Sequence, residues 1–335
     1  MGVSWRQTHL WHETCAIGAT LEQTLADTEG ATAVAGLLGG GDVRRIVATG
    51  NGAALYAATA LWLASLQGRR GPDLVAVPAG LLARGSFQWR PGDVLLAFSS
   101  SGELRDVIEA LDAGAPAPFA AITASPGSTI GSRAAAVMTV AVTSQEAVTH
   151  TQAFCGNVVA ALAVWAEVTG DAALRSAVRA VPAITAEAVE QAPAWVSDLP
   201  PFEPTAAVVF GSGAAWAAAL EGALLLKEVA AIPAEGVETR EGTTSAMYAL
   251  GPGHLVVSLP TAEGTLLEEA ERTCAARGAT VIRAPGGDLS DQRLSAVTAF
   301  PAAVALAARL GLERGLDVDA PAWTDAYYAV ARGVG

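Results

Sequence analysis

Short apolar runs alternate with longer segments of helical periodicity along the first half of the chain. Five runs have the length and composition of buried strands, at residues 43–49, 74–77, 94–98, 119–123 and 137–142. Alanine and leucine recur at helical spacing in segments such as 53–66 and 154–168. Strands that alternate with helices predict a parallel sheet covered by helices on both faces. Residues 5–29 predict one further helix, packed on this first domain.

The second half repeats part of the first. Residues 50–58 have a counterpart at 211–219, and residues 92–98 have one at 253–259, with the same offset of 161 positions. Two matches in one register predict a duplicated domain. Four prolines gather shortly before the second copy, which predicts a linker. The expected organisation is therefore an N-terminal helix with a first doubly wound domain at 1–190, a linker at 191–204 and a second such domain at 205–335.

A serine-rich loop is the most informative local motif. Ser99, Ser100 and Ser101 follow the apolar run 94–98 and precede a helical segment from 103 to about 111. Hydroxyl groups and free backbone N–H groups at the start of a helix are typical of a phosphate site. The alternative is an ordinary turn in which Ser101 caps the helix, and these residues alone leave both interpretations open. The corresponding loop of the second copy, 260–262, has no such cluster, so only the first copy is expected to bind an anion.

Composition narrows the class of protein. With 52% hydrophobic and 16% charged residues in 335, the chain is long and apolar enough for two globular domains. A net charge of −13 without a basic cluster argues against nucleic acid as a partner. Three distant cysteines predict neither disulfides nor a zinc site, and no metal is expected. The sequence has no export signal and no run of eighteen apolar residues, so we expect a cytoplasmic protein without a membrane span.

A glycine turn follows the first predicted strand. Gly50, Asn51 and Gly52 allow a ligand to approach the backbone closely, but Leu55 stands where a dinucleotide fingerprint needs a third glycine. A nicotinamide cofactor is therefore disfavoured, and no cofactor is expected.

Several motifs together carry a resemblance to a known family. The tandem layout, the loop 99–103, the segment 220–229 and the segment 315–321 resemble the sugar isomerase (SIS) domain family. Within it, the chain is most similar to the isomerase half of glucosamine-6-phosphate synthase, to fructosamine-phosphate deglycases and to aminosugar-phosphate deaminase/isomerases. The similarity covers nearly the whole chain from about residue 11. It implies two flavodoxin-like domains, a sugar-phosphate ligand and a homodimer with its site near the two-fold interface.

The resemblance also implies roles for individual residues. Glu228 matches the carboxylate that moves a proton between C1 and C2 of an open-chain sugar, and Glu221 lies two helical turns earlier on the same face. Both carboxylates could instead be satisfied by backbone donors, an interpretation that we favour for Glu221. Residues expected to hold the substrate are Ser99, Ser100, Ser101, Gly50, Asn51, Gly52, Leu104 and Thr151.

The chain departs from the family pattern at functional positions. Thr244 stands where the family has its ring-opening histidine, and Leu225 and Ala326 stand where relatives carry lysines. His150, and Arg240 and Glu241 on the loop after Glu228, could compensate, although a lone histidine is more often structural. Two functions remain: an isomerase or deglycase/deaminase that acts by acid/base chemistry, with a non-sugar substrate not excluded, or a SIS protein that binds a sugar phosphate without catalysis.

Overall fold

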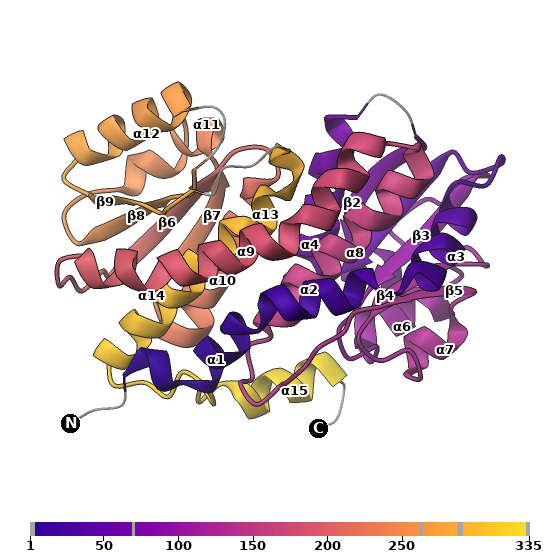
Figure 1. The fold of residues 1–335 in the computed structure, drawn as a ribbon, viewed down its shortest axis with the longest axis horizontal. Coiled ribbons are helices and arrows are strands. Elements are labelled where there is room, and N and C mark those ends of the chain that lie inside the picture. Colours follow the sequence, from indigo (N-terminus) through magenta and orange to yellow (C-terminus); the bar gives the residue numbers. More distant parts are fainter. Residues whose placement is uncertain (1–3, 69–70, 261–263, 287–290, 333–335) are drawn as a thin grey trace. The chain divides into compact units, whose positions relative to one another are not determined.

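The computed structural model describes residues 4–68, 71–260, 264–286 and 291–332, which form two compact units (Figure 1). Unit 1 comprises residues 1–18, 144–151 and 181–322, and unit 2 comprises residues 19–143, 152–180 and 323–335. Both units are discontinuous in sequence.

Unit 2 is built on a five-stranded parallel sheet of order β2-β1-β3-β4-β5. The strands are β1 (Arg45–Gly50), β2 (Asp73–Pro78), β3 (Asp93–Phe98), β4 (Ala120–Thr123) and β5 (Ala136–Thr139). One face packs on α5 (Ala79–Ala83), α6 (Arg105–Asp112) and α7 (Thr129–Arg133) through a cluster that includes Leu82, Val107 and Ile130. Helix α3 (Thr28–Leu38) contacts β5, and α4 (Ala53–Leu66) contacts β1. Unit 2 also contains most of α2 (Ile17–Leu25), most of α8 (Thr151–Thr169) and the whole of α15 (Thr324–Arg332).

Unit 1 is built on a four-stranded parallel sheet of order β7-β6-β8-β9. Its strands are β6 (Ala206–Gly211), β7 (Ala234–Glu238), β8 (His254–Ser258) and β9 (Thr280–Arg283). Helix α10 (Ala215–Ala230) packs on β6 and β7 and also against α14 (Phe300–Glu313), while α12 (Gly264–Ala276) covers the face that carries Phe210 and Val256. The remaining elements are η1 (Trp5–Gln7), α1 (His9–Cys15), α11 (Thr239–Gly242), η2 (Ala246–Ala249), η3 (Gln292–Leu294) and α13 (Ser295–Thr298).

The predicted α/β class with two parallel sheets is confirmed. Strands β6, β7 and β8 begin 161 positions after β1, β2 and β3 respectively, the offset found in the sequence. In both sheets, the first of these strands lies between the second and the third. The sequence repeat thus corresponds to the same local order of strands in the two units.

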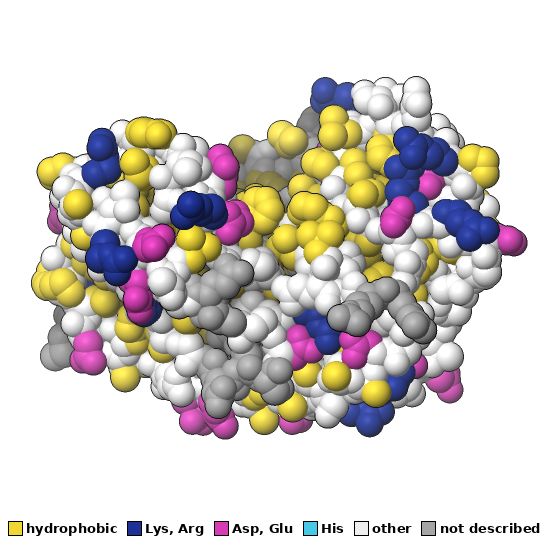
Figure 2. Space-filling model, turned by 90° about the horizontal axis from the view of Figure 1, so that it is seen from above, with side chains coloured by type: hydrophobic (Ala, Val, Ile, Leu, Met, Phe, Trp, Pro, Cys, Tyr) yellow, Lys and Arg dark blue, Asp and Glu magenta, His cyan; other side chains and the backbone are white. Residues whose placement is uncertain are grey.

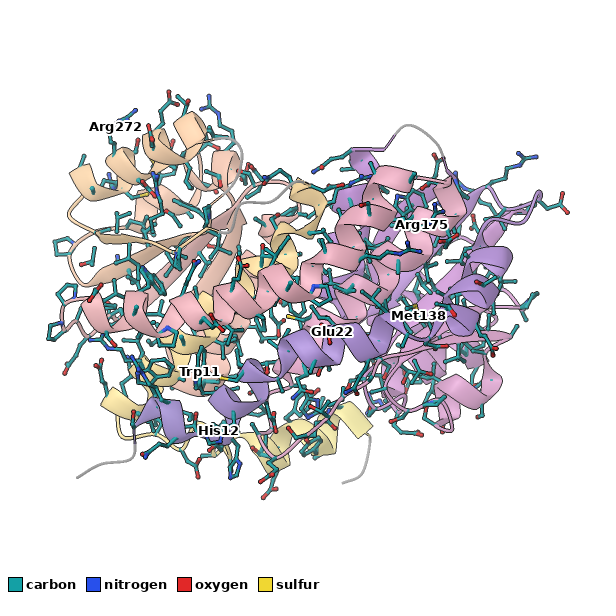
Figure 3. All side chains as sticks on the ribbon, in the orientation of Figure 1. Trp11, His12, Glu22, Met138, Arg175 and Arg272 are labelled. Atoms are coloured by element: carbon teal, nitrogen blue, oxygen red, sulfur yellow. The ribbon has the colours of Figure 1, made fainter. Side chains whose placement is uncertain are left out.

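The predicted single helix at 5–29 is wrong. Four short helices, η1, α1, α2 and α3, occupy residues 5–38, because Thr8 and Asp27 cap new helices with their side chains. The first two belong to unit 1 rather than to the first sheet's unit. In α1 the side chain of Trp11 is buried and lies edge-on to Trp5, whereas His12 is exposed (Figure 3).

The predicted linker at 191–204 is also wrong over most of its length. Helix α9 (Ala172–Asp198) continues through Pro182 and Pro193, and the border between the two units falls inside it. The Pro193 carbonyl accepts hydrogen bonds from the Arg6 guanidinium (3.1 Å) and from the Ser197 hydroxyl (2.8 Å). Tertiary packing of α9 therefore outweighs the cost of a proline inside the helix, and only residues 199–205 are irregular.

Charged side chains of both signs share the face of the protein drawn in Figure 2. On the side drawn in Figure 2, arginine side chains are dispersed among acidic and apolar ones. The helical segments 151–169 and 292–313 are long and apolar enough to cross a membrane. In the 18-residue apolar stretch of each, however, 83% and 94% respectively is buried inside the protein. This burial is typical of core helices.

Candidate functional site

Glu228 lies near the C-terminal end of α10, in a helix of alanine and leucine. Burial raises the pKa of its carboxyl from 4.5 to about 7, against the opposing effects of Thr149 and Lys227. The Thr149 hydroxyl donates a hydrogen bond to Glu228 Oε2 across 3.4 Å. A carboxyl with a pKa near neutrality can take up and release a proton under cellular conditions, as a general base must.

Glu221 lies two turns before Glu228 on the same helix. Its side chain is 2% exposed, and Oε2 has no hydrogen-bond partner among the described residues. Burial first, and the charge of Glu228 second, raise its pKa well above 4.5. The interpretation favoured from the sequence, a carboxylate satisfied by backbone donors, is therefore wrong at Oε2. Glu221 and Glu228 form an electrostatically coupled pair, which we call the α10 carboxylate pair.

A short segment, residues 144–151, carries the Thr149 that bonds Glu228. Glu13 Oε1 accepts hydrogen bonds from the backbone N–H groups of Glu146 and Ala147, and the Val148 N–H donates to the Asp319 carbonyl (2.9 Å). The carboxylate of Asp319 in turn accepts from the first N–H groups of α1, at His9 (3.0 Å) and Leu10 (2.8 Å). Two acidic residues from opposite ends of the chain thus fix the segment that orients Glu228.

The other predicted residues of unit 1 have different surroundings. His150 lies in the same segment, half-buried, next to Thr149. Thr151 begins α8, is 1% exposed and accepts a 3.4 Å hydrogen bond from the Thr14 hydroxyl. Glu241 lies on α11 with an exposed side chain, and no hydrogen bond joins it to Glu228 within the part of the chain that the structure describes.

The serine loop of unit 2 lies between β3 and α6, as predicted. Ser99 is fully buried, and its hydroxyl accepts from the Gly102 N–H (3.0 Å), while the Ser101 hydroxyl accepts from the Glu103 N–H (3.2 Å). Gly102 has a positive φ of 68°, and a Cβ there would overlap Ser128 Oγ. Each of these hydroxyls keeps its proton available for donation, so the loop has the features of a turn and retains the donors of an anion site.

The glycine turn lies at the same edge of the unit 2 sheet. Gly50 ends β1, Gly52 has a positive φ of 53°, and the Asn51 amide donates a 2.6 Å hydrogen bond to Asp106 Oδ2. Asp106 lies in the first turn of α6, whose N-cap is Leu104. The carboxylate of Asp106 interacts favourably with the dipole of α6 and would compete with a bound phosphate for it.

The departures from the family pattern occupy apolar or exposed positions. Leu225 is fully buried in α10, and Ala326 is exposed on α15. The Thr244 hydroxyl is exposed and donates to the carbonyls of Arg240 and Glu241. Among the described residues, no three His, Cys, Asp or Glu side chains are placed to hold a metal ion.

Comparisons with solved structures identify the fold. The C-terminal domain of glucosamine-fructose-6-phosphate aminotransferase from Francisella tularensis matches with a TM-score of 0.78, 17% identity, and coverage of 95% of this chain and 100% of that one. The chain has the SIS fold. Glucosamine-6-phosphate deaminase from Thermotoga maritima matches this SIS chain with a TM-score of 0.74 and 19% identity, over 93% of this chain and 97% of that one. Tagatose-6-phosphate ketose/aldose isomerase from Escherichia coli matches with a TM-score of 0.74 and 18% identity, over 95% of this chain and 97% of that one.

Neither protein-family models nor curated proteins match the sequence.

Sequence reasoning found Glu228 but missed the residues that surround it. Thr149 and Glu13 carry no motif of their own, and the only signal for Asp319 was its place in the segment 315–321.

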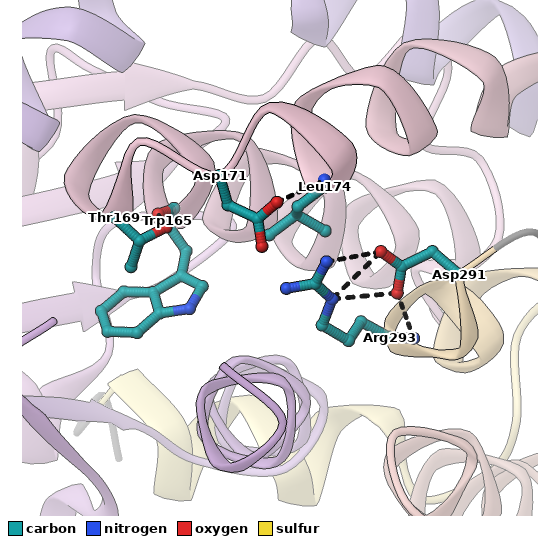
Figure 4. Close-up of polar contacts among 6 residues, drawn as sticks. All are labelled: Trp165, Thr169, Asp171, Leu174, Asp291 and Arg293. Atoms are coloured by element: carbon teal, nitrogen blue, oxygen red, sulfur yellow. Dashed lines mark hydrogen bonds and ion pairs between the residues drawn. The ribbon is translucent and has the colours of Figure 1, made fainter. Parts of the chain in front are cut away.

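Elsewhere in unit 1, the nearly buried guanidinium of Arg293 makes hydrogen bonds of 2.6–3.1 Å to the Asp291 carboxylate (Figure 4). The charges of Arg293 and Asp291 neutralise each other, so we assign this ion pair no role in catalysis.

Proposed function

We propose that this SIS-fold protein is an enzyme that moves protons on a sugar phosphate or a sugar-phosphate amine adduct, with Glu228 as the general base. The observation that carries the proposal is the Glu228 carboxyl itself, buried in α10 and held at a pKa of about 7. Abstraction of a proton next to a carbonyl needs a base of this kind in an apolar enclosure.

The chemistry assigns a task to each residue around Glu228. The carboxylate takes the proton from the carbon beside the carbonyl, solvent protonates the oxygen or nitrogen on which charge develops to give an enediol or enolamine, and the carboxyl returns its proton to the neighbouring carbon while solvent removes the proton from the other oxygen. For an amine adduct, protonation of the enolamine at carbon gives an imine; water adds to its C=N bond, the C–N bond breaks, and the products are the free amine and the sugar carbonyl. The Thr149 hydroxyl donates to one carboxylate oxygen and fixes its orientation. Burial, with the charge of Glu228 as a second cause, raises the pKa of Glu221 and so favours the uncharged form of that carboxyl beside the base.

The class of substrate is supported by the fold neighbours. Their names contain glucosamine-6-phosphate, fructose-6-phosphate and tagatose-6-phosphate, all phosphorylated hexoses or amino-hexoses. We assign phosphate binding to the serine loop and the glycine turn, with a tandem of two SIS domains as the working architecture. The absence of the ring-opening histidine at Thr244 favours a substrate that arrives in open-chain form or as a linear adduct.

A binding protein without catalysis is the second candidate. Leu225 and Ala326 supply no charge where relatives carry lysines, and Asp106 opposes an anion at the start of α6. These features would suit a protein that senses a sugar phosphate with modest affinity.

Solvent exchange separates the two candidates. The protein would be incubated in deuterium oxide with a panel of hexose phosphates and fructosamine phosphates, and NMR would follow label at C1 and C2. We expect exchange with the wild type, none with Glu228→Gln, and unchanged exchange with Glu190→Gln, which alters an exposed glutamate on α9. Binding by the wild type without exchange would refute catalysis and would support the second candidate, a protein that binds a sugar phosphate without catalysis.

The phosphate assignment has its own test. Ser99→Ala with Ser101→Ala should weaken binding of phosphorylated ligands by about 1–3 kcal/mol, because hydrogen bonds to a charged group are lost. Ser132→Ala, which removes an exposed hydroxyl from α7 in the same unit, is the control. An unchanged affinity in the double variant would show that the loop is an ordinary turn.

A further inference from the structure

Within the described residues, three buried hydroxyls at the carboxyl edge of the unit 1 sheet have no hydrogen-bond partner. Ser212 is 6% exposed, and Thr239 and Ser258 are fully buried. The hydroxyl oxygen of each has no hydrogen-bond partner among the described residues. A buried hydroxyl without a partner costs about 1–3 kcal/mol, so three in one unit indicate a missing polar group.

The strand pairing brings these hydroxyls to one place. Gly211 pairs with Glu238 on the adjacent strands β6 and β7, so the residues that follow, Ser212 and Thr239, leave the sheet side by side. Ser258 pairs with Phe210 on the other side of β6. Neighbouring strands are about 4.8 Å apart, which places all three residues around the end of β6. The carboxyl ends of central strands are where open α/β sheets bind their ligands.

The start of α10 adds one further donor at the same edge. Gly213 is exposed, has a positive φ of 54°, and leads into a sixteen-residue helix that no side chain caps. In the first turn, Trp216 Nε1 is buried and also lacks a partner among the described residues. The N–H groups of Ala215, Trp216 and Ala217 donate to the carbonyls of Ser212, Gly213 and Ala214, so the added donor is the indole N–H of Trp216. An indole N–H can only donate, and hydroxyls can donate as well.

We propose that the edge formed by Ser212, Thr239, Ser258 and Trp216 is a second oxyanion site, which binds the phosphate group of a small phosphorylated molecule. A set made of donors, beside the positive end of a helix dipole, favours an anion over a cation or an apolar group. The nearby carboxylate of Glu238 already accepts from the N–H groups of Arg240 and Glu241. This site is independent of the serine loop and of Glu228, so it gives the second copy of the repeat a ligand of its own.

The test follows the Trp216 indole N–H by NMR of the full chain, labelled with ¹⁵N at tryptophan and titrated with inorganic phosphate. Trp216→Phe identifies the signal among the eight tryptophans. We expect a saturable shift in the wild type and an apparent Kd about tenfold weaker in the triple variant Ser212→Ala/Thr239→Val/Ser258→Ala. These hydroxyls make no hydrogen bond to any residue that the structure describes, so the variant should keep its circular dichroism spectrum and its Tm.

Two controls make the outcome specific. Ser295→Ala removes a buried hydroxyl of the same unit that does have a partner, the Gln292 carbonyl, and should leave the phosphate response intact. Ser101→Ala should also leave it intact, which separates this site from the serine loop. A Trp216 signal that ignores phosphate would show that the hydroxyls hold only water and would overturn the proposal. An apparent Kd for phosphate that is the same in the triple variant as in the wild type would overturn it too.

Discussion

Glu228→Gln should stabilise the folded protein in a pH-dependent way. The wild-type carboxyl has a pKa of about 7 in the folded state against 4.5 as the ordinary value. Between these two values the folded state holds the proton and the unfolded chain has released it, so stability falls as the pH rises and then levels off above about 7. The difference in pKa corresponds to about 3 kcal/mol, because each unit is worth about 1.4 kcal/mol.

Glutamine keeps the shape of the side chain and removes the titration. At pH 8 the variant should therefore be more stable than the wild type by up to about 3 kcal/mol, and the advantage should vanish near pH 4.5. Urea denaturation, followed by tryptophan fluorescence at several pH values, measures both free energies of unfolding. Glu190→Gln, at an exposed position of α9, should show no such trend. A stability difference that stays constant between pH 5 and pH 8 would refute a buried, proton-holding carboxyl at Glu228.

Further predictions concern the surroundings of Glu228 and the assembly. Thr149→Val removes the hydrogen bond that lowers the pKa of Glu228, so the pH at which turnover rises should move upward; an unmoved pH profile would contradict this role. Glu13→Gln should lower the free energy of unfolding by about 1–3 kcal/mol and speed amide exchange at Glu146 and Ala147, because it weakens the acceptor of their N–H groups. Glu22→Gln, on the exposed face of α2, should change neither quantity. Light scattering at micromolar concentration should give a homodimer, and a monomeric mass would contradict that expectation.

The sheets were predictable because their signals are local. Apolar runs bounded by turn residues located β1 to β5 within a few residues, and the offset of 161 positions located β6 and β8. The linker was not predictable, since prolines usually end helices. Here Pro193 remains inside α9, and its carbonyl is bonded by Arg6, a residue 187 positions away. No local pattern contains that contact.

The candidate site was predictable only where one segment carried it. Glu228 belongs to a motif that is recognisable by itself, but its partner Thr149 lies 79 positions earlier. The hydrogen bonding of Glu221 was misjudged for a related reason. A glutamate in an alanine-rich helix gives no sign of whether a donor reaches it, and in the fold Oε2 is buried without one among the described residues.

The discontinuous make-up of unit 1 has a practical consequence for dissecting the gene. A truncation at the apparent repeat boundary, residue 205, would yield a fragment with Glu228 but without α1, Thr149 and the C-terminal part of α9. Such a fragment would expose the surface of α14 that packs against α1, and it should aggregate on expression. The two sequence repeats are therefore not separable modules, and autonomous pieces would have to be cut by tertiary contacts rather than by the repeat.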